Sequence, residues 1–243
     1  MNALKFLAGI PLILAATLSW GDSKPVKTFA SEAKASQVVE IFTSEGCSSC
    51  PPADKWLSTF KKDPDLFKTL VPLAFHVDYW DWLGWKDRFG SKEYTQRQRD
   101  YVKSDQLSQA YTPGILVNSQ EFRQWFRGAR KLPNNSGKPG ILSADLSKDN
   151  TLTINFKTNE PLVANVAILG MGITSTIKRG ENTGKTLLHD FVVLNVDKKL
   201  GKGQWQFKLP DLKTLETGKQ PALAIWLSEQ DSPVIIQATG GYL

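Results

Sequence analysis

Two cysteines, two histidines and two methionines are all that this chain of 243 residues offers of the residue types that bind soft metals. A structural zinc site takes about four ligands. Only His76 and His189 could complete a site begun by the single cysteine pair, so the composition argues against a zinc centre. Met171 is the only methionine after Met1, so the chain also lacks the methionine-rich cluster expected of a copper carrier. We expect no bound metal and no cofactor.

Concentrated positive charge is absent as well. The net charge of +6 is spread over small groups such as Lys61–Lys62, Arg97–Arg99 and Lys198–Lys199. No basic stripe with interleaved aromatic residues appears, so the pattern gives no support for a nucleic-acid partner. We expect a solvated surface with weak attraction to anionic components of the cell envelope.

The chain has no apolar run long enough to span a bilayer. The run from Phe6 to Leu18 falls short of the ~20 residues that a membrane-spanning helix needs. Lys5 precedes it and small residues follow it, which is typical of an export signal. We therefore expect a signal peptide over residues 1–21 and a periplasmic or secreted protein, with an uncleaved anchor as the alternative. Residues 22–36 are polar and are expected to form a flexible lead-in.

What the chain does contain is Cys47-Ser48-Ser49-Cys50, two thiols separated by two residues. The preceding run Val38–Thr43 is β-branched and aromatic, as in a buried strand. Residues Pro51–Phe60 carry apolar side chains at helical spacing, and proline is favoured at the first helical position. The cysteines are thus predicted at a strand-to-helix turn, on the N-terminus of a helix.

A helix N-terminus favours a reactive thiolate, because its unpaired N–H groups and its dipole stabilise negative charge. Cys47, at the turn itself, is expected to be the more exposed sulfur and the nucleophile. Cys50 is expected to be shielded and to resolve a mixed disulfide. A structural staple is the main alternative. A disulfide that closes four residues removes only about 2 kcal/mol of chain entropy, and a chain of this size can build a core without it.

Strand and helix patterns alternate over residues 37–132. Leu70–Val77 is nearly all apolar, as in a central strand covered on both faces. Ser91–Lys103 is expected to be a helix. Gly114–Val117 and Glu121–Phe126 are expected to form a hairpin. This order predicts an α/β domain with a small mixed sheet.

Residues 133–140 have the composition of a linker, and residues 141–243 show no helical pattern. Six or seven short alternating runs separated by turn residues predict an all-β sandwich of immunoglobulin-like type. The runs are Leu152–Phe156, Val163–Met171, Leu187–Val196, Trp205–Phe207, Ala222–Leu227 and Val234–Ala238.

The segment Glu40–Asp54, EIFTSEGCSSCPPAD, resembles the active-site segment of the thioredoxin superfamily. Over most of its length the chain resembles, more closely, a bacterial secreted family known only as domain of unknown function 1223. The further stretches that carry this resemblance are Ala74–Asp81, Leu83–Asp87, Gln96–Gln98, Tyr111–Pro113 and Arg179–Leu187. The family brings no established substrate, whereas the thioredoxin likeness implies thiol–disulfide exchange.

The same likeness implies three further roles. Pro113, preceded by Thr112, occupies the place of the cis-proline opposite the redox pair, and the backbone of Thr112 would pair with a substrate chain. Glu40 resembles the buried acid that moves a proton to or from the inner cysteine, although it stands one residue farther from the first cysteine than in thioredoxins. A surface acid on an edge strand is the alternative for Glu40. The Ser-Ser dipeptide matches neither the Gly-Pro of reductants nor the Pro-His of oxidants, so the direction of exchange is not implied.

An aromatic stretch follows the second strand, at the end of a parallel sheet where ligands bind. A functional interpretation makes Trp80, Trp82 and Trp85 one wall of a peptide groove beside the redox pair. The favoured alternative is that most of them cap the sheet or join the two domains. His76 is expected to be a hydrogen-bonded core histidine, and no chemistry is expected of His189.

These patterns predict an exported thiol–disulfide oxidoreductase in which a thioredoxin-like domain is fused to an immunoglobulin-like sandwich. Its substrates would be protein or peptide thiols and disulfides, and a separate redox partner would reset it. The rival hypothesis is a non-enzymatic binding module or Cu(I) carrier of the cell envelope. An interaction protein with an inert disulfide is the third.

Overall fold

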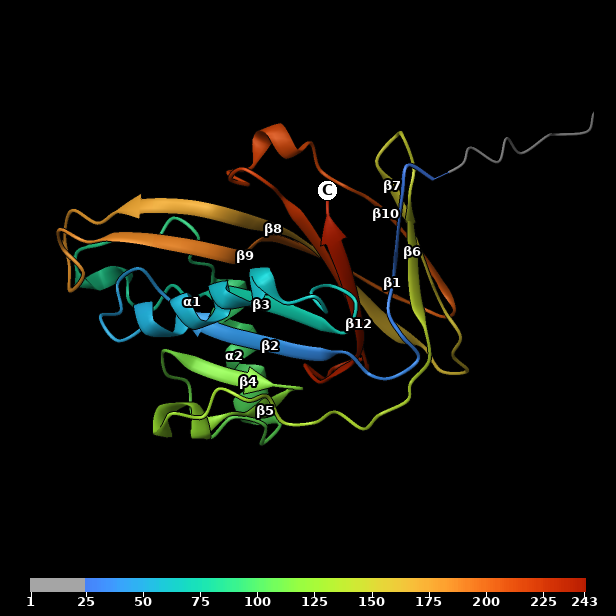
Figure 1. Ribbon diagram of the computed structural model, residues 1–243, viewed down its shortest axis with the longest axis horizontal. Helices are drawn as coiled ribbons and strands as arrows, with labels where there is room; N and C mark the ends of the chain where they lie inside the picture. Colours follow the sequence, from blue (N-terminus) through green and yellow to red (C-terminus); the bar gives the residue numbers. More distant parts are fainter. Residues whose placement is uncertain (1–24) are drawn as a thin grey trace, which may run out of the picture.

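Two β-sheets, one of eight strands and one of four, form the frame of the molecule (Figure 1). The computed structural model describes residues 25–243. The predicted signal peptide, residues 1–21, lies outside the described residues. Within residues 25–243, no helix is both long and apolar enough to cross a membrane.

Strands and helices alternate in the first half of the chain. They are β1 (Lys27–Ala30), β2 (Gln37–Thr43), α1 (Pro51–Ser58) with a 3₁₀ continuation (Thr59–Lys62), β3 (Leu70–His76), a 3₁₀ turn (Asp81–Leu83), α2 (Lys92–Lys103), β4 (Gly114–Val117), β5 (Gln120–Glu121) and a 3₁₀ helix (Arg123–Arg127).

The second half is almost entirely strand. Its elements are β6 (Leu142–Leu146), β7 (Thr151–Phe156), β8 (Leu162–Thr176), β9 (Thr186–Gly201), β10 (Gln204–Lys208), a 3₁₀ turn (Leu212–Thr214), β11 (Ala222–Ser228) and β12 (Ile235–Tyr242).

Strands β2 and β3 lie in the interior of the eight-stranded sheet, and their residues are buried nearly throughout. They pair in parallel, and β4 pairs antiparallel on the other side of β2. Helix α1 begins at Pro51, where the missing N–H group of proline would have no helical partner in any case. Helix α2 begins after Ser91, whose hydroxyl accepts a hydrogen bond from the backbone N–H of Glu93.

The two helices cover opposite faces of these strands. Successive side chains of a strand point to opposite faces. Phe42 of β2 packs edge-on against Tyr101 of α2, so this face belongs to α2. Thr43 and His76 are partners in the β2–β3 register and point the other way. That second face is covered by α1, whose Asp54 lies close enough to His76 for their charges to interact.

The large sheet does not stop at the predicted domain boundary. Its strand order is β12-β11-β8-β9-β3-β2-β4-β5, and β9 pairs in parallel with β3 through Val192 and Ala74. The predicted linker, residues 133–140, therefore joins two segments that share one sheet. The fold is a mostly β structure with an α/β part, as expected in outline. The strands after residue 140 do not form a sandwich separate from the first half.

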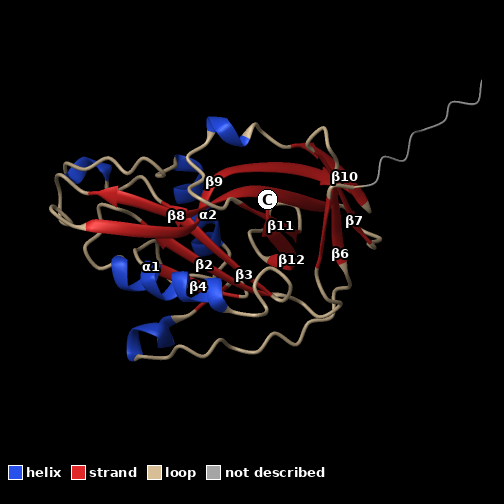
Figure 2. Cartoon of the chain, turned by 45° about the horizontal axis from the view of Figure 1, so that its top comes forward, coloured by secondary structure: helices blue, strands red, loops and turns tan. Residues whose placement is uncertain are grey.

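The four-stranded sheet β1-β6-β7-β10 packs over the far end of the large sheet. Figure 2 shows α1 and α2 at one end of the molecule and the small sheet at the other. Side chains from both sheets fill the space between them, including Phe29, Ile154 and Trp205 from the small sheet and Ile168 and Ile225 from the large one. This end has the layered packing of a sandwich.

Two local expectations are wrong. The expected flexible lead-in, residues 22–36, contains β1, which pairs antiparallel with β6. Phe29 is buried there in the sandwich core and holds an otherwise polar segment in place. The expected second strand of the hairpin, Glu121–Phe126, shrinks to β5, and the chain turns into a 3₁₀ helix that buries Trp125.

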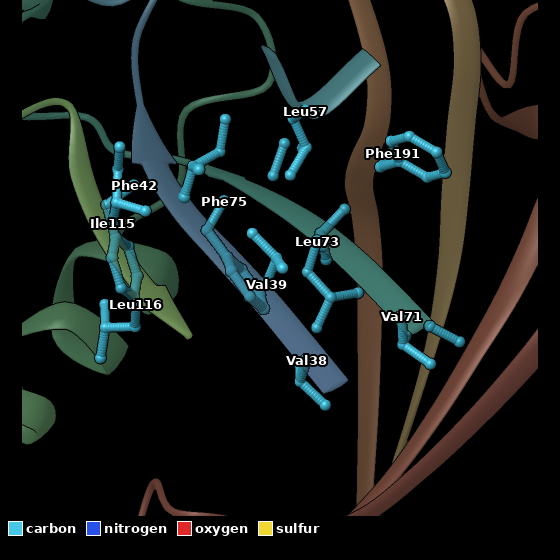
Figure 3. Close-up of a cluster of buried hydrophobic side chains, with 14 of the residues drawn as sticks. Val38, Val39, Phe42, Leu57, Val71, Leu73, Phe75, Ile115, Leu116 and Phe191 are labelled. Carbon is cyan, nitrogen blue, oxygen red and sulfur yellow. The ribbon is translucent and has the colours of Figure 1, made fainter. Parts of the chain in front are cut away.

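One apolar core joins the two halves. In Figure 3, side chains from β2, β3, β4 and α1 gather beside Phe191, which belongs to β9. Trp226 of β11 belongs to the same core. Full burial of one large apolar side chain stabilises a fold by about 1.5–3 kcal/mol, so neither half can be removed without exposing part of the other.

Candidate functional site

The two cysteines form a disulfide at the start of α1. The Cα atoms of Cys47 and Cys50 are 5.5 Å apart. Cys50 immediately precedes Pro51, the first residue of α1, and its carbonyl oxygen accepts hydrogen bonds from the backbone N–H groups of Ala53 and Asp54. The cysteine pair thus lies at the strand-to-helix turn predicted from the sequence.

Both cysteines are buried in this oxidised state. The exposed fraction is 1% for Cys47 and 0% for Cys50, so in this state neither cysteine is open to solvent, and the expected difference in exposure between them is very small. Only Ser48 and Ser49, between them, face solvent. A partner sulfur can therefore reach Cys47 only after some part of its surroundings has moved.

The loop before β4 lies beside this turn, and Trp80 connects the two. The Thr112–Pro113 peptide bond is cis. The indole N–H of Trp80 donates to the hydroxyl of Thr112 at 2.7 Å. The Cβ atom of Trp80 would lie 3.1 Å from a Cβ added at Gly46, the residue before Cys47. A side chain at position 46 would therefore press on Trp80, which would have to shift by a few tenths of an ångström.

The other two tryptophans have different positions. Trp82 is 80% exposed. Trp85 donates its indole N–H to the carboxylate of Glu45 at 2.7 Å, and it packs against Gly180 from the second half. Trp80 therefore lies against the redox turn, Trp82 lies on the surface, and Trp85 joins the two halves of the chain.

Glu40 does not serve the cysteines in the way that the resemblance implies. Its carboxylate accepts two hydrogen bonds from the guanidinium of Arg97, at 2.7 and 2.9 Å, and one from the hydroxyl of Tyr101. The alternation of β2 directs Glu40 to the α2 face, whereas the helix that follows Cys50 covers the opposite face. Glu40 is also fully buried on an interior strand, so it is not a surface acid either.

Ionisable side chains do gather on the α1 face, next to the redox turn. We call Glu45, Asp54, His76, Asp87 and His189 the buried ionisable cluster. His76 Nδ1 lies 2.7 Å from Asp87 Oδ2, and the same oxygen accepts a hydrogen bond from the backbone N–H of Glu45. His189 Nε2 lies 3.2 Å from Glu45 Oε1. The two imidazole rings are 5.2 Å apart.

Within the cluster, paired charges overcome the effect of burial. Burial alone would lower the pKa of His76, but the facing carboxylate of Asp87 raises it above its ordinary value. Burial would raise the pKa of Asp87, but His76 holds it below its ordinary value. The pKa of Glu45 is lowered against burial by its contact with His189. The carboxylates of Asp87 and Glu45 and the imidazole of His76 therefore favour their charged forms.

Asp54 is the exception. Burial raises the pKa of Asp54, and the imidazoles of His76 and His189 offset this only in part. Asp54 follows Cys50 by four residues, so the two lie on one face of the helix, and helical side chains tilt toward the N-terminus. Its carboxyl group lies close enough to Thr43, His76 and His189 to interact with them. Asp54 also lines a surface pocket between α1 and β9.

Three imidazole nitrogens of the cluster are buried and have no hydrogen-bond partner among residues 25–243. They are His76 Nε2 and both ring nitrogens of His189, of which Nε2 still lies 3.2 Å from Glu45 Oε1. A buried polar atom without a partner costs about 1–3 kcal/mol, so each such atom calls for an explanation. The α1 face therefore combines these nitrogens with the carboxyl group of Asp54, whose pKa burial raises. The sequence reasoning assigned no chemistry to His189 and passed over Asp54.

The second half of the chain also contacts the redox turn directly. Residues 177–185, between β8 and β9, form what we call the hairpin tip. The side-chain amide of Asn182 donates to the carbonyl oxygens of Glu45 and Cys47, both at 2.9 Å. These bonds tie the tip to the backbone on either side of Gly46.

Glu181 makes the neighbouring contact. Its carboxylate accepts a hydrogen bond from the backbone N–H of Ser48 at 3.0 Å. Both residues belong to the stretch Arg179–Leu187, which contributed to the family resemblance. No periodicity connects that stretch to a turn 133 residues earlier, so sequence reasoning missed both contacts.

Comparison with known proteins agrees with the pattern of matching segments. The family described as "Protein of unknown function (DUF1223)" matches residues 38–228. The chain belongs to this family. The matched region includes the redox turn, the Thr112–Pro113 loop and the hairpin tip. No curated protein matches the chain.

Two solved structures are similar in fold. A crystal structure of a protein from Agrobacterium tumefaciens is 25% identical, with a TM-score of 0.61, and the match covers 86% of this chain and 94% of that one. HBP35 of Porphyromonas gingivalis is 15% identical, with a TM-score of 0.50, and the match covers 86% of this chain and 76% of that one. The second likeness concerns the fold alone.

Proposed function

We propose that this member of the DUF1223 family is an exported, thioredoxin-like thiol–disulfide oxidoreductase. The observation that carries the proposal is the disulfide of Cys47 and Cys50 at the start of α1, with the cis-proline loop held beside it through Trp80. A four-residue disulfide is a poor staple for a chain with one continuous core. The same disulfide is well placed to open and close.

The exchange balances with the two thiols alone. In the reducing direction, the thiolate of Cys47 attacks one sulfur of a substrate disulfide, and the other substrate sulfur leaves as a thiolate and takes up a proton. The thiolate of Cys50 then attacks the sulfur of Cys47. The second substrate thiol leaves, and the Cys47–Cys50 disulfide forms with two electrons passed to the substrate. An external dithiol returns these electrons, and the reverse sequence oxidises a substrate dithiol.

Resolution by Cys50 requires a proton acceptor inside the protein. Cys50 is fully buried, and burial disfavours its thiolate. Asp54, one helical turn away, has a pKa that burial raises, which favours uptake of the proton that Cys50 gives up. In this proposal Asp54 fills the role first expected of Glu40. Thr112, Trp80 and Trp82 supply the surface on which a substrate chain rests.

Two matched variants test the proposal. Cys50→Ser removes the resolving thiol, so it should accumulate mixed disulfides with a substrate such as insulin. Cys47→Ser removes the attacking thiol and should accumulate few or none. Non-reducing gels and mass spectrometry read both outcomes. If neither variant forms a mixed disulfide, and wild-type protein neither reduces nor oxidises insulin in a glutathione buffer, the disulfide is inert and the proposal fails.

A further inference from the structure

We propose that Glu181 and Asn182, in the hairpin tip, are positioning residues of the redox turn. In this proposal Asn182 holds the turn closed around Cys47, and Glu181 disfavours the thiolate of Cys47. The inference rests on the proposed thiol–disulfide exchange and adds a control exerted on it by the second half of the chain.

Asn182 has the contacts of an anchor. Its side chain is fully buried, and its amide group donates to the carbonyl oxygens of Glu45 and Cys47. Its remaining polar atom accepts a hydrogen bond from the ammonium group of Lys185 at 2.8 Å. Loss of this side chain would leave two carbonyl oxygens of the turn without these donors, which favours opening of the turn to water.

The hairpin tip is braced and can act on the turn as one unit. The backbone N–H of Ile177 donates to Lys185, and the backbone N–H of Gly184 donates to Ile177. Gly180 adopts a φ of +77° and lies against Trp85, at a position where a Cβ would come within 3.2 Å of that side chain. The contact between Gly180 and Trp85 therefore fixes the position of the hairpin tip relative to Cys47.

Glu181 acts through charge. The N–H group of Ser48, next to Cys47, is one of the donors near the start of α1 that could face a thiolate, and Glu181 already occupies it. A like charge within about 4–6 Å disfavours ionisation of a thiol. The hydrogen bonds from Ser48 hold the pKa of Glu181 below its ordinary value, so Glu181 is ionised throughout the range in which a thiol titrates.

Other ionisable groups also surround the turn and must stay unchanged in a test. They are Glu45 on the turn, Asp54 on α1, Lys185 on the hairpin tip, His189 on β9, and His76 with Asp87 behind them.

The test of Glu181 is alkylation of the reduced protein by iodoacetamide as a function of pH, with Cys47 followed by mass spectrometry. Glu181→Gln retains a hydrogen-bond acceptor but removes the charge. We expect its titration midpoint to fall and alkylation of Cys47 at pH 6 to be about threefold faster, which corresponds to about half a pKa unit. The difference should shrink in 1 M salt, because the carboxylate of Glu181 is exposed to solvent. Glu160→Gln, an exposed acid on another loop, is the control. Equal midpoints for wild type and Glu181→Gln would overturn the role of Glu181.

The test of Asn182 is the rate rather than the midpoint. Asn182→Ala should speed alkylation of Cys47 about tenfold at every pH, because the turn opens more often. Thr176→Ala, an exposed position at the end of β8, is the control. If Asn182→Ala does not fold, Asn182→Ser, which keeps one hydrogen-bond donor, takes its place. An unchanged rate would overturn the role of Asn182.

Failure of this inference is distinguishable from failure of the proposed function. Wild-type protein that exchanges with insulin, alongside variants that react like wild type, would refute the inference alone. Wild-type protein that never exchanges with insulin would refute the proposed function. The alkylation midpoints would still report on Glu181 in that case.

Discussion

Two groups of buried charges lie on opposite faces of β2 and β3, and they differ in how completely they are paired. On the α2 face, both carboxylate oxygens of Glu40 are hydrogen-bonded, and the guanidinium of Arg97 also lies 5.1 Å from the ring centre of Phe75. On the α1 face, within residues 25–243, the buried ionisable cluster retains three imidazole nitrogens without a hydrogen bond and a carboxyl group, that of Asp54, with a raised pKa.

This difference distinguishes buried charges that stabilise the fold from buried groups that are able to exchange a proton. A fully paired buried charge is held in one protonation state, because any change leaves its partner unpaired in a medium of low dielectric constant. An incompletely paired group can still gain or lose a proton near neutral pH, and such groups concentrate at functional sites. Burial and charge are common to both faces. The degree of pairing is what differs between them.

The largest expected effect on stability comes from breaking the ion pair of Glu40 and Arg97. Arg97→Met leaves the carboxylate of Glu40 buried without its cation, which should lower the free energy of unfolding by about 3–5 kcal/mol. Urea denaturation at pH 7 measures it. The double variant Glu40→Gln with Arg97→Met should recover part of the loss, because no charge is then left unpaired. A loss below 1 kcal/mol for Arg97→Met would contradict the prediction that the ion pair of Glu40 and Arg97 stabilises the fold.

The next prediction concerns Asp54, on the α1 face. Asp54→Asn removes an acid whose ionisation the fold disfavours, so it should raise stability at pH 7 by about 1 kcal/mol, a typical size for one substitution. It should also slow closure of the Cys47–Cys50 disulfide by about a hundredfold, the lower range of general acid–base contributions. Stopped-flow measurement of a single turnover, with the exposed Asp65→Asn as control, distinguishes the two effects. A faster or unchanged closing step would remove Asp54 from the site.

A smaller effect depends on pH. The pKa of Asp87 is lowered, so its contribution to stability is present above its ordinary value and is lost as the pH falls through the lowered pKa. The pKa of His76 is raised, so its contribution is complete below about 6.5 and is lost as the pH rises through the raised pKa. Asp87→Asn should therefore destabilise the protein by about 1.5–3 kcal/mol near pH 5 and by less near pH 8.

Urea denaturation at both pH values measures that difference. Glu216→Gln, which removes an exposed ion pair with Arg88, is the matched control and should cost no more than about 1 kcal/mol at either pH. A loss for Asp87→Asn that is equal at pH 5 and pH 8 would contradict the assignment of a charged pair with His76.

Much of the local structure could be predicted from the sequence. The apolar runs of β2 and β3, the proline at the start of α1 and the helical pattern of Ser91–Lys103 all depend on neighbours in the chain, and each predicted the correct element. The resemblance to thioredoxins led to Pro113, whose preceding peptide bond is cis. Spacing alone could not have suggested that bond.

The rest depends on contacts that no local pattern encodes. Alternation along β2 places Glu40 and Phe42 on one face, but which helix covers that face follows from packing, such as that of Phe42 on Tyr101 of α2. The parallel pairing of β3 with β9 joins residues more than a hundred positions apart. His189 contacts Glu45 and Asn182 contacts the backbone of Cys47 across this long-range arrangement, so neither contact could be predicted from the sequence.

The pairing of β3 with β9 also sets an order in time for a chain that folds as it is made or delivered. Until β9 arrives, the nearly all-apolar edge of β3 stays open to neighbouring chains, which favours aggregation. Long-range pairing of this kind slows folding, because the chain loses the entropy of closing a long loop before the stabilising contacts form. Cys47 and Cys50 leave the ribosome early, whereas Glu181 and Asn182 follow more than 130 residues later. A disulfide that closes early therefore closes in a turn that lacks its second half, and the newly made protein passes through a stage in which its thiols are open to any oxidant.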